Sequence, residues 1–257
     1  HKVDNASAPD AEIAKLVTAL DIDQKYYKSF DPARKRELLV VFPNGTTDLA
    51  GVRKIVERFK GVVKYWEARN EPNFFMSATA FVNNELKPFY ELVKSVDPSM
   101  KVMGPGAVSV GPPMAGWNDE FFRAGGGKYI DAFSFHAYNC VNGDLTLVRQ
   151  SFDQIDAWLR TYNLVGIEKW QTEQGFYGPT WGGYQPRMQG RWTMLQMMTY
   201  EQYGIPKEHN HYWYDRNGGF WDHPCWIENE DESINPVGPL LRVWSEELYG
   251  TNFVSKY

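Results

Sequence analysis

The sequence has 257 residues, of which 43% are hydrophobic, and a formal net charge of −5 from 27 basic and 32 acidic residues. This length and composition predict a folded α/β protein, either one barrel or two small domains. The charges are spread without long runs, which excludes a basic face for nucleic acid or an anionic membrane, and the apolar stretches fall well short of the roughly 20 residues that a membrane span needs.

Strand-like and helix-like patterns alternate along the chain. Residues 1–37 show mainly a helix around 11–20 followed by a polar segment that contains tyrosines. Six apolar runs then predict strands at 38–42, 62–68, 101–108, 131–137, 168–173 and 209–214, the third of them broken by Gly104-Pro105-Gly106. Helices are expected between them, at 49–60 with Asp48 as its cap, 78–96, around 120–122, 145–162 and 185–203, and after them at 238–248.

Strands separated by helices predict a parallel sheet with helical crossovers. The strand bodies are apolar and polar residues follow their ends, which favours a barrel over the alternative, a doubly wound open sheet. The glycines at 104 and 106 are a weak phosphate-loop candidate because the further glycine of a dinucleotide site is absent. We expect a single domain over 1–257, with 1–37 as an atypical N-terminal segment.

Two glutamates follow directly on strand-like runs and precede turn residues. Glu71 lies in Tyr-Trp-Glu-Ala-Arg-Asn-Glu-Pro-Asn (65–73), and Glu173 lies in Lys-Trp-Gln-Thr-Glu-Gln-Gly (169–175). Parallel α/β folds carry their chemistry at the carboxyl ends of the strands. Cleavage of a glycosidic bond uses two carboxyl groups, one as an acid and one as a nucleophile or base. The pair therefore points to a glycosidase, whereas Glu67 and Glu168 are expected to lie outside the site.

Three motifs resemble the clan A retaining glycoside hydrolases, with families 5 and 39 nearest. They are Asn70-Glu71-Pro72, His136-Ala137-Tyr138 and Thr172-Glu173, each after an apolar strand. The resemblance implies a (β/α)8 TIM barrel in which the Asn-Glu pair ends the fourth strand and the nucleophile ends the seventh. It also implies hydrolysis of β-linked oligo- or polysaccharides by a double displacement, without a cofactor.

The same resemblance implies a role for each matching residue. Glu71 is the general acid and then the base, Glu173 is the nucleophile, and Asn70 binds the 2-hydroxyl group of the sugar. His136 and Tyr138 line the site, and the sugar ring rests on Trp213.

The chain departs from this pattern at its start. Counting back from Glu71, the first two barrel strands are not evident, and the arginine that the clan carries near the end of the second strand has no match. We expect either a fragment or a barrel that a missing segment or a partner chain completes. A catalytically inactive carbohydrate-binding protein, or a structural glycoprotein subunit on the same barrel, is the alternative.

Aromatic residues make up 16% of the sequence, and several tryptophans lie in segments rich in glycine and proline. Trp181 and Trp221 are therefore candidates for substrate binding, as are Trp117 and Trp226, since binding residues concentrate on loops; packing in a core is the competing interpretation. His209 and His211 alternate on one strand without a third ligand at suitable spacing, so no metal site is predicted. Ser134 lacks the Gly-x-Ser-x-Gly context of a nucleophile elbow.

Localisation is indicated only by short signals. Asn5-Ala-Ser and Asn44-Gly-Thr match the N-glycosylation pattern, which favours a secreted glycoprotein. Residue 1 is histidine and no signal peptide is present, so the chain is expected to be processed, tagged or incomplete. Cys140 and Cys225 are too few for a disulfide scaffold, and one disulfide or two separate thiols are both consistent with the sequence.

Overall fold

The computed structural model describes residues 1–27, 38–108, 115–137, 145–174, 186–205 and 207–210. Its six strands form one sheet in chain order, and the pairs β1–β2, β2–β3 and β5–β6 are parallel. The strands are β1 (Leu39–Val41), β2 (Tyr65–Glu67), β3 (Lys101–Val108), β4 (Ala132–His136), β5 (Glu168–Gln174) and β6 (Lys207–Asn210). The predicted parallel sheet with helical crossovers is therefore confirmed, while 211–214 and 238–248 lie outside the described residues.

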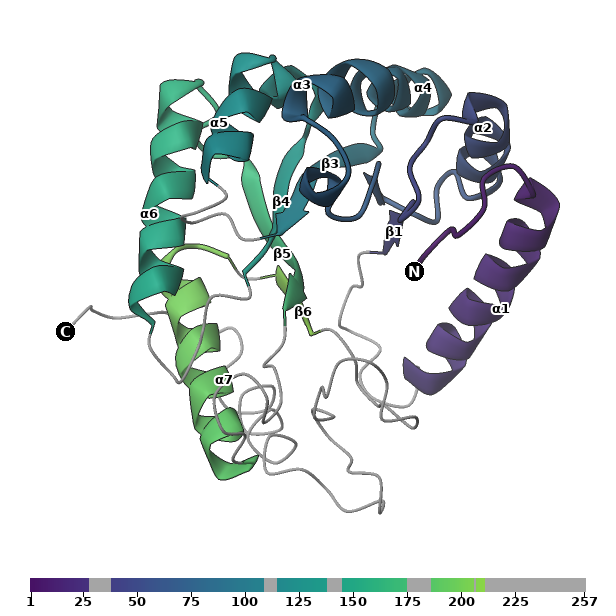
Figure 1. The fold of residues 1–257 in the computed structure, drawn as a ribbon. Coiled ribbons are helices and arrows are strands. Elements are labelled where there is room, and N and C mark those ends of the chain that lie inside the picture. Colours follow the sequence, from purple (N-terminus) through teal and green to yellow (C-terminus); the bar gives the residue numbers. More distant parts are fainter. Residues whose placement is uncertain (28–37, 109–114, 138–144, 175–185, 206, 211–257) are drawn as a thin grey trace. The chain divides into compact units, whose positions relative to one another are not determined.

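Helices follow the strands as the alternating pattern predicts (Figure 1). They are α1 (Pro9–Tyr27), α2 (Leu49–Arg58), α3 (Ala78–Phe81), α4 (Lys87–Val96), α5 (Ala115–Arg123), α6 (Thr146–Thr161) and α7 (Pro186–Gln202). Shorter turns are η1 (Pro72–Phe74), the π-helical η2 (Val82–Leu86) and η3 (Gly126–Tyr129). The Asp48 cap is confirmed, because its side chain accepts a hydrogen bond of 3.1 Å from the Gly51 amide.

The chain divides into two compact units, residues 1–107 with 116–134 and residues 108–115 with 135–257. In the first unit, α2 contacts both α1 and α4, as Figure 1 shows, and buries Val52, Ile55 and Val56. Phe42 stacks at 6.3 Å from Trp66 and meets the edge of Phe89. Apolar strand and helix faces thus form the core expected of this unit. The prediction of a single domain stays a prediction.

The second unit is held together around Phe152 on α6. Its ring lies 5.8 Å from Phe135 of β4, 5.2 Å from Tyr200 of α7 and 5.2 Å from Tyr203. Trp170 of β5 is also buried. Aromatic pairs of this kind add to the stabilisation that burial of their apolar area supplies. They fix α6 and α7 against each other at positions that the helical periodicity of the sequence predicts.

β3 is one continuous strand, so the predicted break at Gly104-Pro105-Gly106 is wrong. The peptide bond between Gly104 and Pro105 is cis, and Gly106 has a φ of +62°. Glycine adopts this backbone conformation without the clash that a Cβ atom causes. Both glycines are therefore part of β3. Within the described residues, no helix begins directly after them, whereas a phosphate loop leads into a helix.

The first three residues of the chain pair with β1, which the sequence did not predict. The Val3 amide donates to the Val41 carbonyl at 2.9 Å, and the Val41 amide donates to the His1 carbonyl at 2.9 Å. Lys2 forms a parallel bridge with Val41, on the edge of β1 that faces away from β2. This segment is followed by α1 and then β1, which is the strand–helix–strand order of the rest of the sheet.

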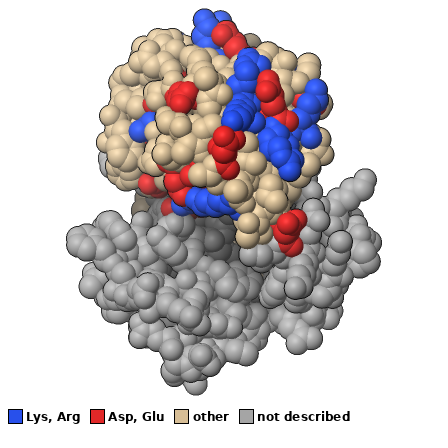
Figure 2. Space-filling model, turned by 90° about the vertical axis from the view of Figure 1, so that its right-hand side faces the viewer, with Lys and Arg blue, Asp and Glu red and all other residues tan. Residues whose placement is uncertain are grey.

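The surface around α1 and α2 carries both signs of charge (Figure 2). Lys54 pairs with Asp10 at 2.7 Å, and Arg53 pairs with Glu57 at 3.4 Å. Interspersed charges give no single-sign field on the face shown, which agrees with the absence of long charge runs in the sequence. In the part of the chain that the structure describes, no helix is long and apolar enough to cross a membrane.

Candidate active site

Glu71 lies in the turn that follows β2 and has an unusual backbone conformation. Its φ of 47° and ψ of 53° place it in the left-handed region, which few residues other than glycine adopt. The Glu71 amide donates to the Gly106 carbonyl of β3 at 3.0 Å, and η1 begins at the next residue, Pro72. Backbone outliers of this kind cost about 1 to 3 kcal/mol and concentrate at functional sites. The conformation therefore supports a functional role for Glu71.

The residues before Glu71 are held by a buried ion pair. Arg69 Nη1 lies 2.8 Å from Glu85 Oε1 and 3.1 Å from the Asn44 carbonyl. The side chains of Arg69 and Glu85 are only 14% and 4% exposed, so the pair is largely shielded from water. Asn70 lies between Arg69 and Glu71 and is partly exposed, which leaves it accessible to a ligand. The pair fixes the turn that presents Asn70 and Glu71.

Glu67 is a buried carboxylate that reaches from β2 across β3. It is 1% exposed, and the Ser134 hydroxyl of β4 donates to its Oε1. The path crosses Gly106, where an added Cβ would lie 2.7 Å from Glu67 Oε1. Glu67 thus belongs to the interior of the sheet beneath the Glu71 turn. The sequence indicates only that a glutamate interrupts an apolar run, and it does not reveal this contact.

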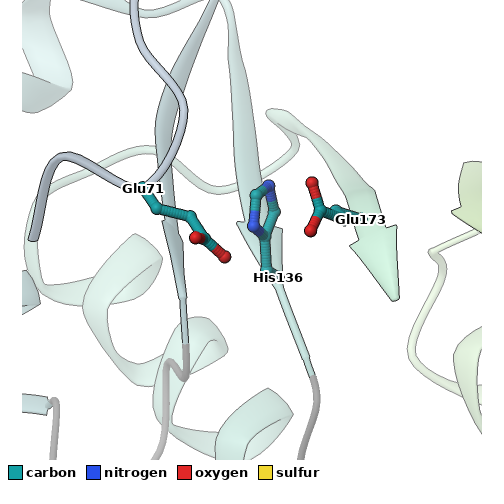
Figure 3. Close-up of side chains that lie close together, drawn as sticks. All are labelled: Glu71, His136 and Glu173. Atoms are coloured by element: carbon teal, nitrogen blue, oxygen red, sulfur yellow. The ribbon is translucent and has the colours of Figure 1, made fainter. Parts of the chain in front are cut away.

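His136 and Glu173 face each other at the ends of β4 and β5 (Figure 3). A ring nitrogen of His136 lies within 4.8 Å of a carboxylate oxygen of Glu173. His136 is buried, and Glu173 is partly exposed. A histidine nitrogen and a carboxylate oxygen are also metal ligands, so the absence of a metal stays a prediction.

The end of β4 is held by two glutamines that the sequence analysis did not single out. The Ala137 amide donates to Gln171 Oε1 at 3.2 Å, and Gln196 donates to the Ala137 carbonyl at 3.4 Å. Both glutamines are buried and also contact the Tyr200 hydroxyl. Buried amides in a satisfied network fix the backbone that they bind. Their effect here is to hold the residue that follows His136.

Several predicted site residues lie outside the described residues, and their placement stays a prediction. They are Tyr138, Trp181, Trp213, Trp221 and Trp226, together with Cys140, Cys225 and His211. Trp117 is described, and the expectation of a loop position is wrong because it belongs to α5. Its ring stacks on Phe121 at 6.1 Å, and its indole N–H donates to the Met76 carbonyl at 2.8 Å. Trp117 is therefore a packing residue.

A pocket of 520 Å³ lies at the opposite end of β5 from Glu173. Its lining includes Glu168, Lys169 and Tyr203. Lys169 pairs with Asp156 at 2.9 Å, and Glu168 accepts a hydrogen bond of 3.0 Å from the Trp170 indole. Active sites of α/β sheets lie at the carboxyl ends of the strands. This pocket lies at the other end of β5, so it is not part of a site around Glu173.

The chain resembles known proteins in its structure. No protein-family model and no curated protein matches the sequence. The structure is similar to a glucosidase from Croceicoccus marinus, with 19% identity, a TM-score of 0.60, and coverage of 80% of this chain and 48% of that chain. It is also similar to a family 39 glycoside hydrolase from Bacteroides cellulosilyticus, with 17% identity, a TM-score of 0.61, and coverage of 79% and 49%.

A third similar structure is a family 128 curdlan-specific exo-β-1,3-glucanase from Blastomyces gilchristii, with 15% identity, a TM-score of 0.59, and coverage of 81% and 84%. The chain has the fold of a partial (β/α)8 barrel. It spans about half the length of the first two structures. The structural similarity establishes the fold, whereas identities this low leave the activity to be argued from the site.

Proposed function

We propose that this barrel is a retaining glycoside hydrolase that cleaves β-linked oligo- or polysaccharides. The observation that carries the proposal is the position of the two glutamates. Glu173 is the last residue but one of β5 and lies beside His136, and Glu71 follows β2 in a left-handed turn. Three strand positions separate β2 from β5 in the sheet, as the fourth and seventh strands of the clan A barrel are separated.

The proposed reaction has two displacements. In the first, Glu71 gives its proton to the glycosidic oxygen, the Glu173 carboxylate attacks the anomeric carbon, and the leaving sugar departs as an alcohol. In the second, Glu71 takes a proton from water, the water oxygen attacks the same carbon, and the bond to Glu173 breaks. Each displacement inverts the anomeric carbon, so the product keeps the β configuration.

The two displacements require the two glutamates to play different roles. The nucleophile must be ionised while the acid holds its proton, so the two sites need different environments. His136 places an imidazole nitrogen close to Glu173, where a ring N–H can stabilise the carboxylate. Glu71 lies on a separate turn, whose amide is bonded to β3. Asn70 is adjacent to the acid and is proposed to bind the 2-hydroxyl group.

Chemical rescue distinguishes the two roles. With aryl β-glycosides and azide, Glu173→Ala should yield an α-glycosyl azide, because azide replaces the nucleophile and attacks once. Glu71→Ala should yield a β-glycosyl azide, because azide attacks the glycosyl-enzyme. Glu168→Gln, on the same strand as Glu173 but at its other end, is the matched control and should retain activity. Equal activity of all three variants and the parent would overturn the proposal.

The alternative is a carbohydrate-binding protein without catalysis. Such a protein would bind oligosaccharides equally well as the parent and as Glu173→Gln, and neither would hydrolyse them. Turnover by the parent and its loss in Glu173→Gln would exclude this alternative.

A further inference from the structure

Two exposed phenylalanines directly follow the turn of Glu71. Phe74 and Phe75 are 62% and 66% exposed, and they are the only aromatic residues among the strongly exposed large hydrophobic residues of the described chain. Isolated exposed apolar residues are common on protein surfaces, but two adjacent rings beside a candidate site form a patch. The aliphatic residues of that exposed set are Leu49, Val62, Leu147, Val165 and Met198.

The backbone beneath the two rings is well anchored. The Phe74 amide donates to the Glu71 carbonyl at 3.1 Å, and the Phe75 amide donates to the Pro72 carbonyl at 2.9 Å. The Met76 carbonyl then accepts the hydrogen bond of the Trp117 indole. The rings therefore project from a fixed turn, within one turn of chain from the candidate acid. A rigid platform loses little conformational freedom when a ligand binds to it.

The two rings form a corner. Their centroids are 6.5 Å apart, and their planes cross at 81°. The Arg69 guanidinium lies 5.3 Å from the centroid of Phe75, and its ion pair with Glu85 holds it in place. One side of the Phe75 ring is thus occupied by a cation, while most of its surface remains open to solvent. The arrangement presents an apolar, flat surface bounded by a second ring.

We propose that Phe74 and Phe75 form an aromatic subsite for a sugar ring on the leaving-group side of the cleaved bond. The proposal rests on the proposed function, because a proton donor lies beside the leaving oxygen and this turn carries the donor. The pyranose rings of β-linked glucose and xylose chains have equatorial substituents, so their axial C–H groups form apolar faces. The negative face of an aromatic ring attracts such C–H groups, and the exposed rings match them in size.

The test compares two substrates that differ only in the leaving group. A β-linked oligosaccharide places a sugar on the leaving-group side, whereas the glycosyl fluoride of the same sugar places only fluoride there. Laminari-, cello- and xylo-oligosaccharides would be tried first with the parent to choose the sugar. Phe75→Ala and Phe74→Ala should then lower kcat/KM for the oligosaccharide by roughly tenfold, the upper range for an aromatic contact. The loss for the glycosyl fluoride should be several times smaller.

Two controls keep the result specific. Phe75→Tyr retains a flat ring and should restore most of the oligosaccharide activity. Val165→Ala changes a residue that is 75% exposed but distant in sequence from the turn, and it should leave both substrates unaffected. Circular dichroism of each variant verifies that the exposed substitutions leave the fold intact.

The outcomes separate this proposal from the proposed function. A parent that hydrolyses none of the substrates overturns the function and the leaving-side assignment with it. An active parent whose phenylalanine variants lose nothing, or lose equally on oligosaccharide and fluoride, overturns the subsite alone. Rings that serve only as a docking surface for another protein would give that second result.

Discussion

Gly106→Ala should destabilise the protein far more than an ordinary glycine substitution. Gly106 has a φ of +62°, and an added Cβ would lie 2.7 Å from Glu67 Oε1 and 3.2 Å from the Arg69 carbonyl. The left-handed backbone costs an L residue about 1 to 2 kcal/mol. The carboxylate must also move, which weakens its bond with Ser134, and a lost hydrogen bond to a buried charged group costs about 1.5 to 3 kcal/mol. The sum is about 2.5 to 5 kcal/mol.

A second glycine isolates the contact from the backbone strain. Gly61 has a φ of +76°, and an added Cβ there would meet nothing within 4 Å. Gly61→Ala should therefore cost only the strain, about 1 to 2 kcal/mol. Both substitutions restrict the unfolded chain equally, so the difference between them reports the contact with Glu67.

Urea unfolding followed by circular dichroism measures the free energy of unfolding for each variant. The Gly106→Ala penalty should shrink by about 1 kcal/mol or more in a Ser134→Ala background, because the hydrogen bond is already absent there. If Gly106→Ala proves no more destabilising than Gly61→Ala, then Glu67 does not cross β3 at this glycine, and the interior described above is wrong.

Two further predictions concern the same unit. Arg69→Met should cost about 3 kcal/mol, because it leaves the buried Glu85 carboxylate without its partner, and Arg69→Met with Glu85→Leu should recover most of that loss in urea unfolding. The Gly51 amide, which donates to Asp48, holds the pKa of that carboxyl below its ordinary value of 3.8. The ionised cap therefore stabilises the fold above this pH, and its contribution is lost on acidification. Melting temperatures of the parent and Asp48→Asn should converge as the pH falls below 3.8 and through the lowered pKa of Asp48, and a constant difference would contradict this reasoning.

Regular elements of the barrel were predictable because their signals are local. The helix that begins after Asp48 shows its cap and its apolar face in the sequence, and α6 shows the same periodicity over 145–162. The ends of β2 and β5 were predictable because an apolar run gives way to polar and turn residues there. Glu71 and Glu173 could be selected for the same reason.

Contacts between distant residues were not predictable. Glu67 reads as an ordinary glutamate in a strand, and only the meeting of β2 with β4 across Gly106 gives it a buried partner. The pairing of residues 1–3 with β1 was missed because three residues carry no periodicity. Trp117 was assigned to a loop because glycine and proline precede it, although packing on Phe121 extends α5 to include it.

Trapping of the glycosyl-enzyme tests the central claim most directly. A 2,4-dinitrophenyl 2-deoxy-2-fluoro-β-glycoside of the preferred sugar slows the second displacement, so the covalent intermediate accumulates. Trypsin cleavage after Lys169 and Arg187 releases residues 170–187, in which Glu173 is the only acidic residue. The account predicts a mass increase of one fluorosugar on this peptide, and none in Glu173→Gln. Hydrolysis with an inverted product, or an adduct on another residue, would contradict it.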